Sequence, residues 1–137
     1  MAAFLATEEV SSGFLPGDHG TTFAGSPLAG AVANAVFDTI KSENLVENSK
    51  LMGEYLLSKL NDLDDKYDFI KNVRGAGLLV GLELDFEGGD IVGKMFEKGF
   101  LINCTAGNVL RFAPPLIVKE EEIDALVEAL DEIFAEI

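Results

Sequence analysis

The sequence contains very little cysteine and histidine, and it has no tryptophan. Among 137 residues there is one cysteine, Cys104, and one histidine, His19. A single cysteine excludes an internal disulfide and is typical of proteins in a reducing cytoplasm. One cysteine and one histidine are also too few for the usual kind of zinc site, so the sequence predicts no metal centre.

Basic residues are scarce as well. Ten Lys and Arg stand against 24 Asp and Glu, which gives a formal net charge of −14. Nucleic-acid phosphates and anionic lipid surfaces would repel this charge. The chain also lacks an apolar run long enough to span a bilayer, and its first residues lack the basic segment of a signal peptide. We therefore expect a cytoplasmic protein without a nucleic-acid or membrane partner.

Apolar side chains, in contrast, are abundant enough for one hydrophobic core. They make up 48% of the sequence, and the mean hydropathy is +0.24, which excludes disorder on compositional grounds. Hydrophobic periodicity predicts helices at 27–41, 44–63, 90–97 and 120–137, and strands at 69–73, 78–85, 100–104 and 108–112. This order predicts an α+β fold, in which helices pack on a small, largely antiparallel sheet.

Local signals define several element ends. Ser26 is expected to cap the first long helix with its hydroxyl, and Pro27 suits the first helical position. Gly99 is expected to end the helix at 90–97. The short apolar stretch Met1–Thr7 suits a buried strand. The acidic side of the last helix is interpreted as a solvated surface, because it lies opposite an apolar stripe.

The loop from Gly17 to Pro27 is the first candidate site. It places the adjacent hydroxyls of Thr21 and Thr22 just before a helix start, which suits a phosphate or a carboxylate. An ordinary ordered loop is equally compatible with this composition. Asp18 and His19 form a weak candidate for an acid–base pair, because neighbouring side chains in a loop seldom face each other.

Arg111 is the second candidate. It lies within an apolar strand, between Leu110 and Phe112, so its charge must meet an anion or reach water. Two alternatives stay open at this point: a substrate carboxylate held by two parallel hydrogen bonds, or a buried structural ion pair. The glycine-rich run at 75–81 leads into a strand rather than a helix, so we interpret it as a tight strand connection and not as a dinucleotide loop.

Three segments, 19–29, 73–84 and 103–116, together resemble the class-III pyridoxal-phosphate aminotransferases in order and spacing. The resemblance covers essentially the whole chain and is greatest to the acetylornithine aminotransferases of arginine biosynthesis. Ornithine, succinylornithine and 4-aminobutyrate aminotransferases share the individual motifs, so the substrate remains open among them. An alternative of another class is a stand-alone ligand-binding or regulatory α+β domain.

The resemblance implies that the chain is a C-terminal fragment of a fold-type-I enzyme. Residues 1–25 would be the tail of the large cofactor-binding domain, and 26–137 the connecting helix and the small C-terminal domain. The lysine that attaches pyridoxal phosphate would lie upstream of this chain, so the chain would hold no catalytic residue and would be inactive alone.

The resemblance also implies three binding residues. Thr22 would donate its hydroxyl to the cofactor phosphate of the partner subunit in a homodimer. Thr21 would contact the amino-acid substrate, and Arg111 would bind the substrate carboxylate. The implied partners are therefore the large domain, a second subunit, an amino acid such as N-acetylornithine, and the 2-oxo acid 2-oxoglutarate.

Overall fold

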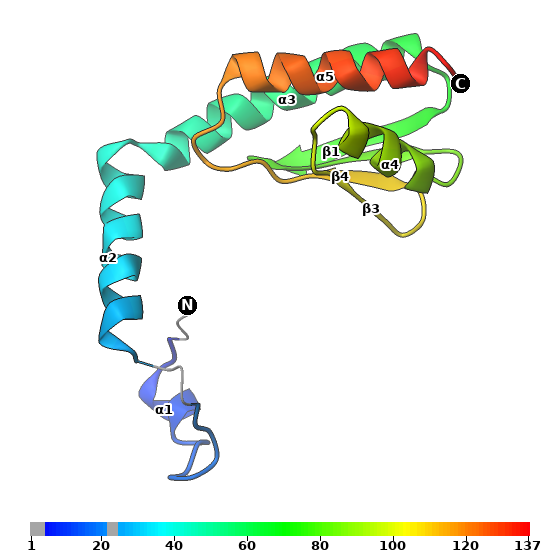
Figure 1. Ribbon diagram of the computed structural model, residues 1–137. Helices are drawn as coiled ribbons and strands as arrows, with labels where there is room; N and C mark the ends of the chain where they lie inside the picture. The colour runs from blue at the N-terminus through cyan, green and yellow to red at the C-terminus, as the bar shows by residue number, and fades with distance from the viewer. Residues whose placement is uncertain (1–4, 22–24) are drawn as a thin grey trace. The chain divides into compact units, whose positions relative to one another are not determined.

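The computed structural model describes residues 5–21 and 25–137, which form two compact units, Met1–Glu43 and Asn44–Ile137 (Figure 1). The units divide after the first long helix. The predicted boundary at residues 25 and 26 concerns the complete enzyme and stays a prediction. None of the helices in the described part of the chain is long and apolar enough to cross a bilayer.

The first unit contains two helices, α1 (Glu8–Ser11) and α2 (Pro27–Ser42). The sequence predicts a strand at Met1–Thr7. Positions 1–4 lie outside the described residues, and positions 5–7 have no regular structure, so no strand forms at 5–7. Strands need a partner, and every strand of the described sheet lies between Ile70 and Phe112. Instead, the hydroxyl of Thr7 accepts a hydrogen bond from the Val10 N–H and caps α1.

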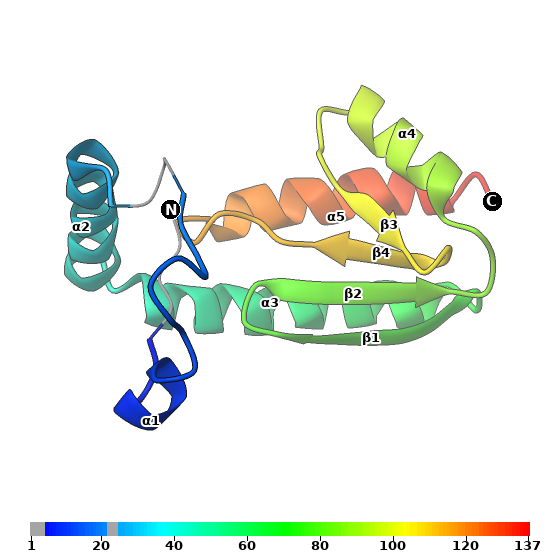
Figure 2. The ribbon, with the colours of Figure 1, turned by 90° about the horizontal axis from the view of Figure 1, so that it is seen from below.

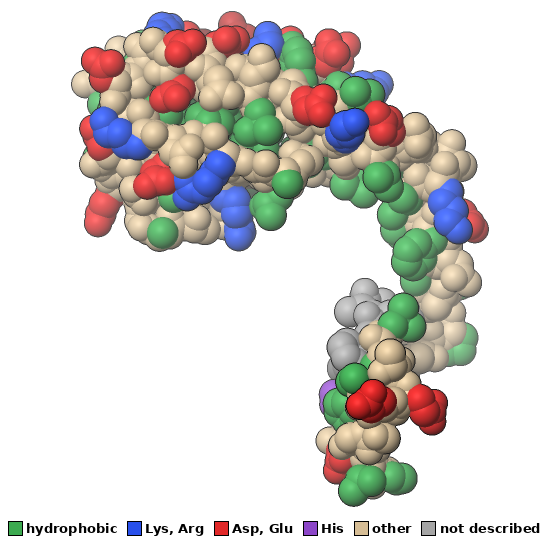
Figure 3. Space-filling model, turned by 180° about the vertical axis from the view of Figure 1, so that it is seen from behind, with side chains coloured by type: hydrophobic (Ala, Val, Ile, Leu, Met, Phe, Trp, Pro, Cys, Tyr) green, Lys and Arg blue, Asp and Glu red, His purple; other side chains and the backbone are tan. Residues whose placement is uncertain are grey.

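Helix α2 begins at Pro27, as the sequence predicts. The cap prediction for Ser26 is wrong, because its hydroxyl accepts no capping hydrogen bond; only its carbonyl accepts one, from the Gly30 N–H at 2.9 Å. Proline at the first position already removes one of the amide groups that a cap would satisfy. The apolar side chains of α2, Val32 and Val36 among them, are exposed, and hydrophobic side chains lie on the surface along this helix (Figure 3).

The second unit contains a four-stranded sheet and three helices. The elements are α3 (Leu45–Lys66), β1 (Ile70–Ala76), β2 (Leu79–Leu84), α4 (Gly89–Glu97), β3 (Asn103–Thr105), β4 (Val109–Phe112) and α5 (Glu120–Phe134). The strand order is β1-β2-β4-β3, and every neighbouring pair is antiparallel. This confirms the α+β fold with an antiparallel sheet.

Helices α3 and α5 cover one face of the sheet, and Figure 2 shows the other face uncovered in front of them. Alternate residues of each strand point into the core, so Leu82, Leu110 and Phe112 are almost fully buried against these helices. Leu56 and Leu60 of α3 and Leu130 of α5 complete the same cluster. The residues between them on each strand point to the open face.

The third strand is shorter than predicted. It was expected from Phe100, but the structure forms it only at Asn103–Thr105. Gly99 has φ +89° after α4, and its N–H donates to Phe96, which confirms its role in ending that helix. The N–H of Phe100 donates to the Met95 carbonyl at 2.9 Å in the same motif, so this residue belongs to the helix end and not to the sheet.

The acidic side of α5 is solvated, as predicted, and it also forms surface ion pairs. Three acidic side chains of α5, and Glu136 just beyond its end, form ion pairs with lysines of α3 and of the end of α4. The pairs are Lys59–Asp124 at 2.9 Å and Lys66–Asp131 at 2.6 Å with α3, and Lys94–Glu136 at 2.8 Å and Lys98–Glu132 with α4. The sequence pattern locates the charges on one side of α5, but the packing of the helices decides which cations meet them.

Helix α3 comes very close to the turn between β1 and β2. A Cβ atom on Gly53 would lie 2.2 Å from the carbonyl oxygen of Gly77. Gly77 itself has φ +52° within the turn. Both glycines are therefore required by backbone geometry, and the glycine-rich run serves as a tight strand connection, as predicted.

Candidate functional site: the open face of the sheet

A row of four residues crosses the open face of the sheet. Strand pairing places Arg74 of β1 opposite Gly81 of β2, Gly81 opposite Arg111 of β4, and Arg111 opposite Asn103 of β3. Because residues paired across strands point to the same face, both arginines of the chain lie on this face, separated by a glycine.

The two arginines differ in their partners. Arg74 forms an ion pair with Glu83, with an N···O distance of 2.5 Å. Arg111 is exposed, and its Nε donates a hydrogen bond to Oδ1 of Asn103 at 3.1 Å. No ion pair joins Arg111 to a carboxylate of the described residues, although the chain holds 24 acidic residues. Within the described residues, therefore, Arg111 is neither buried nor ion-paired, and its role stays a prediction.

This geometry suits the binding of an anion. Arg111 carries a permanent positive charge, and only its Nε is engaged within the described residues. Its neighbour across the strand pair, Gly81, has no side chain to cover it. An anion approaching the open face would therefore meet a guanidinium whose terminal nitrogens pair with no carboxylate of the described residues, an arrangement that suits a carboxylate ligand.

The loop candidate lies in the first unit. Thr22 lies outside the described residues. Thr21 is exposed in a segment without regular structure. The Asp18 carboxylate accepts a hydrogen bond from the Leu15 N–H at 2.7 Å and closes a turn, and no hydrogen bond or ion pair joins it to His19 within the described residues. Thr21 belongs to the first unit and Arg111 to the second, and each is described within its own unit.

Three of the eight lysines do not fit the attachment of a pyridoxal phosphate. Such a lysine must present a neutral amine, which requires a lowered pKa. Hydrogen bonds donated to carboxylates instead raise the pKa of three lysines: Lys59 donates to Asp124, Lys66 to Asp131 and Lys98 to Glu132. These lysines stay protonated, and the chemistry of a Schiff base is not available at them.

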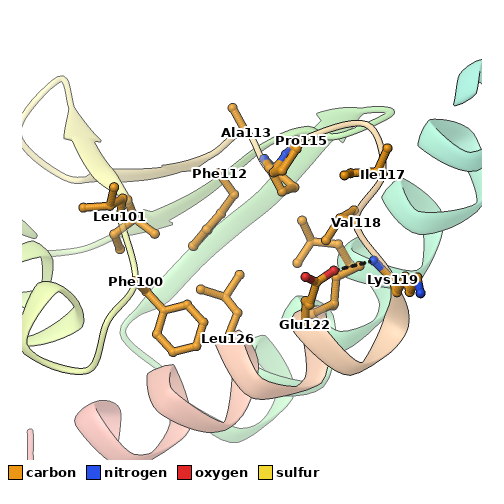
Figure 4. A pocket seen from close by; sticks show the side chains of 14 residues that line it. Phe100, Leu101, Phe112, Ala113, Pro115, Ile117, Val118, Lys119, Glu122 and Leu126 are labelled. Atoms are coloured by element: carbon orange, nitrogen blue, oxygen red, sulfur yellow. Dashed lines mark hydrogen bonds between the residues drawn. The ribbon is translucent and has the colours of Figure 1, made fainter. Parts of the chain in front are cut away.

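A pocket that the sequence did not reveal lies between the segment before β3 and the segment after β4 (Figure 4). Its volume is about 580 Å³, and its lining is mostly apolar, with Phe100 and Leu101 at one end and Ile117 and Val118 at the other. The charged lining residues are Lys119 and Glu122, and the Glu122 carboxylate accepts from the Lys119 backbone N–H at 2.9 Å. The pocket therefore offers apolar contact rather than acid–base chemistry.

Sequence reasoning also missed Asn103. The residue is a surface asparagine in a strand, and the glycosylation motif Asn103-Cys104-Thr105 that it begins has no connection with Arg111. Its importance depends on the register of β3 against β4, which places it opposite Arg111. The sequence predicts both strands but not their register, so only the structure brings the two side chains together.

Comparison with known proteins decides the family. Residues 1–134 match the sequence profile of the aminotransferase class-III family. The chain belongs to this family. The acetylornithine aminotransferase of Methanocaldococcus jannaschii is 54% identical over 139 residues, a match that covers all of this chain and 34% of that protein. The chain thus spans about a third of the length of this curated relative.

Solved structures of class-III aminotransferases share the fold. The acetylornithine aminotransferase of Elizabethkingia anophelis superimposes with a TM-score of 0.85 at 34% identity, covering 97% of this chain and 36% of that one. An ornithine aminotransferase of Toxoplasma gondii, described with partial occupancy of PLP at its active site, has a TM-score of 0.82 at 36% identity, covering 93% of this chain and 31% of that one. The fold assigned from the sequence is confirmed.

Proposed function

We propose that the chain is the C-terminal part of a pyridoxal-phosphate-dependent aminotransferase that transfers the amino group of N-acetylornithine to 2-oxoglutarate. The observation that carries the proposal is Arg111, a guanidinium on an open sheet face with no carboxylate partner among the described residues. A relative of the same family at 54% identity is an acetylornithine aminotransferase, which supports this substrate pair. The proposed setting is arginine biosynthesis in the cytoplasm.

In this proposal the chain contributes substrate binding and not the attachment of the cofactor. Arg111 binds the substrate carboxylate through two parallel hydrogen bonds, which orients the substrate and excludes amines without a carboxylate. The hydroxyl of Thr21 contacts the substrate, and that of Thr22 holds the cofactor phosphate of the partner subunit in a homodimer. The bound cofactor would supply the electron sink of the reaction.

The lysine that attaches the cofactor would come from the part of the enzyme outside this chain. Support for this comes from the ion-paired lysines described above and from the match to only 34% of the Methanocaldococcus relative. We therefore expect the chain alone to be inactive.

A chimera tests the proposal. The chain would replace the matching third of the Methanocaldococcus jannaschii relative, and glutamate formation from N-acetylornithine and 2-oxoglutarate would be measured. We expect activity in the chimera, and a loss of at least about 100-fold in kcat/KM after Arg111→Ala, because the carboxylate loses a charged hydrogen-bond partner. The matched control is Lys50→Ala, which removes an exposed cation from α3. Full activity of the Arg111→Ala chimera would contradict the proposal.

The amino donor has one specific alternative, ornithine, because the Toxoplasma neighbour is an ornithine aminotransferase. Both donors would be assayed with the same chimera. A higher kcat/KM for ornithine than for N-acetylornithine would assign the chain to the alternative substrate without affecting the role of Arg111.

A further inference from the structure

Asn103 and Arg111 face each other across the pair β3–β4. They are direct partners in the strand register, and Oδ1 of Asn103 accepts from Nε of Arg111 at 3.1 Å. We infer that Asn103 is a positioning residue, which fixes the guanidinium of Arg111 so that a carboxylate binds at its two terminal nitrogens. The inference rests on the proposed function, in which Arg111 binds the substrate carboxylate.

The geometry of the guanidinium leads to this binding mode. A carboxylate can form two parallel hydrogen bonds with a guanidinium either at the side edge, which uses Nε and one Nη, or at the end, which uses both Nη atoms. Asn103 occupies the Nε–H of Arg111, so the side edge has lost one of its two donors. The end edge keeps all of its donors and is the edge that a substrate carboxylate would use.

Of the two residues paired with Arg111 across the strands, Asn103 has a side chain that can hold the guanidinium. On the other side of β4, the paired residue is Gly81, which has no side chain that could hold the guanidinium. The next cation along the row, Arg74, is held by the carboxylate of Glu83, which also neutralises it. An amide holds Arg111 without neutralising it. The chain therefore places a neutral partner beside the arginine proposed to bind substrate and a charged partner beside the other.

The test begins with the 137-residue chain itself, because it contains only two arginines, Arg74 and Arg111. Their Nε–H signals are separable by nuclear magnetic resonance, and the rate of hydrogen exchange reports the hydrogen bond. We expect Asn103→Ala to accelerate exchange at Arg111 about fivefold, the effect of losing one net hydrogen bond, with Arg74 unchanged. Unchanged exchange at Arg111 would overturn the inference.

Two further variants separate positioning from a general structural effect. Asn103→Asp keeps an acceptor for Nε and adds a negative charge, so exchange at Arg111 should stay slow. Asn72→Ala is the matched control, because Asn72 is an exposed asparagine on β1 at the other edge of the sheet. It should alter neither arginine. Accelerated exchange at both arginines after Asn103→Ala would indicate a loosened sheet instead, and would also overturn the inference.

The kinetic readout uses the full-length enzyme that carries this chain. Asn103→Ala should raise KM for 2-oxoglutarate about fivefold with kcat nearly unchanged, since orientation of Arg111 affects binding of the carboxylate. Asn103→Asp should raise KM at least as much although it preserves the hydrogen bond, because it neutralises Arg111. A KM unchanged in both variants would refute the positioning role.

The two proposals can fail separately. If Arg111→Ala leaves activity intact while Asn103→Ala still accelerates exchange in the chain, the proposed function is wrong and the hydrogen bond is merely structural. If Arg111→Ala abolishes activity but Asn103→Ala changes neither exchange nor KM, the proposed function stands and the positioning inference is wrong.

Discussion

At the scale of single residues, the site depends on what surrounds one guanidinium. Arg111 lies in an apolar strand pattern, but its side chain points to the open face of the sheet, while Leu110 and Phe112 on either side of it point into the core. The alternation of the strand therefore explains why a charged residue is tolerated between two buried ones. The same alternation makes the guanidinium available to a ligand.

Arg111→Lys tests whether the planar shape of the side chain is needed. Lysine keeps the charge but presents a point ammonium that cannot form two parallel hydrogen bonds. In the full-length enzyme we expect KM for 2-oxoglutarate to rise about tenfold, which corresponds to about 1.4 kcal/mol. Steady-state kinetics over a range of 2-oxoglutarate concentrations measures this. Kinetics identical to the unchanged enzyme for every substrate would remove Arg111 from the site.

The sequence predicts part of this site and no more. Arg111 is recognisable because a charge in an apolar strand needs an explanation. The sequence does not predict that Arg111 lacks an ion pair with the described residues. Each of the 24 acidic residues could have supplied a partner, and only the fold decides which of them are near. Asn103 is not recognisable at all without the strand register.

At the scale of elements, packing accounts for the differences from the predicted pattern. The long helices and the strands on which the sheet is built are found close to the predicted positions, because their periodic patterns are long. The start of β3 differs, because the backbone of Phe100 is used to end α4. Ends of elements depend on such local competition between hydrogen bonds, which a pattern of apolar residues does not encode.

The contact between α3 and the β1–β2 turn gives a stability prediction. Gly53→Ala would place a Cβ atom 2.2 Å from the Gly77 carbonyl oxygen, so the helix or the turn must move. We expect a loss of about 2–3 kcal/mol in the free energy of unfolding, as for other overpacked cores. Urea unfolding of the chain measures this quantity.

The control is Gly93→Ala in α4, where a Cβ atom meets nothing within 4 Å. Because alanine is the better helix former, this variant should gain about 0.5–1 kcal/mol. A Gly53→Ala chain as stable as the unchanged chain would mean that the close approach of α3 to the turn is wrong.

The ion pairs of α5 give a pH prediction. The pKa of Asp131 lies below its ordinary value of 3.8, because the Lys66 ammonium and then the Tyr67 hydroxyl donate hydrogen bonds to its carboxylate. A carboxyl group with a lowered pKa in the folded state stabilises the fold above its ordinary pKa, and this contribution is lost as the pH falls through the lowered value.

Asp131→Asn should therefore be less stable than the unchanged chain at neutral pH and should approach it in strong acid. The expected difference at neutral pH is of the order of 1 kcal/mol, because the pair is partly exposed. Urea unfolding at neutral pH and well below pH 3.8 measures it. Asp62→Asn is the control: this exposed residue of α3 forms no ion pair with the described residues. A difference for Asp131→Asn that is independent of pH would contradict the assignment.

At the scale of the whole molecule, the chain leaves apolar surface uncovered. On α2, the side chains of Leu28, Val32 and Val36 are 76%, 57% and 52% exposed and recur every four residues. The periodicity of the sequence predicts this stripe, and the interpretation of the chain as a fragment predicts its exposure. The chain spans about a third of the length of its Methanocaldococcus relative. In the proposed function, the remainder of the enzyme would supply the packing partner of this stripe.

The exposed stripe predicts that the isolated chain self-associates, since apolar patches of this kind bury themselves when they can. We expect the average mass measured by light scattering to rise with concentration. Val32→Glu should shift the chain toward the monomer, because it places a charge in the stripe. Asn34→Glu adds the same charge on the opposite side of α2 and should not. A chain that is strictly monomeric at every concentration would contradict this prediction.

The central claim is that the chain provides a substrate-binding arginine but not the lysine that holds the cofactor. The most direct measurement is to add pyridoxal phosphate, reduce the adduct with borohydride, and locate the modified lysine by mass spectrometry. In the chimera with the Methanocaldococcus relative, we predict one stoichiometric modification, located outside these 137 residues, and none of that kind in the chain alone. Stoichiometric modification of one of the chain's own eight lysines would contradict the account.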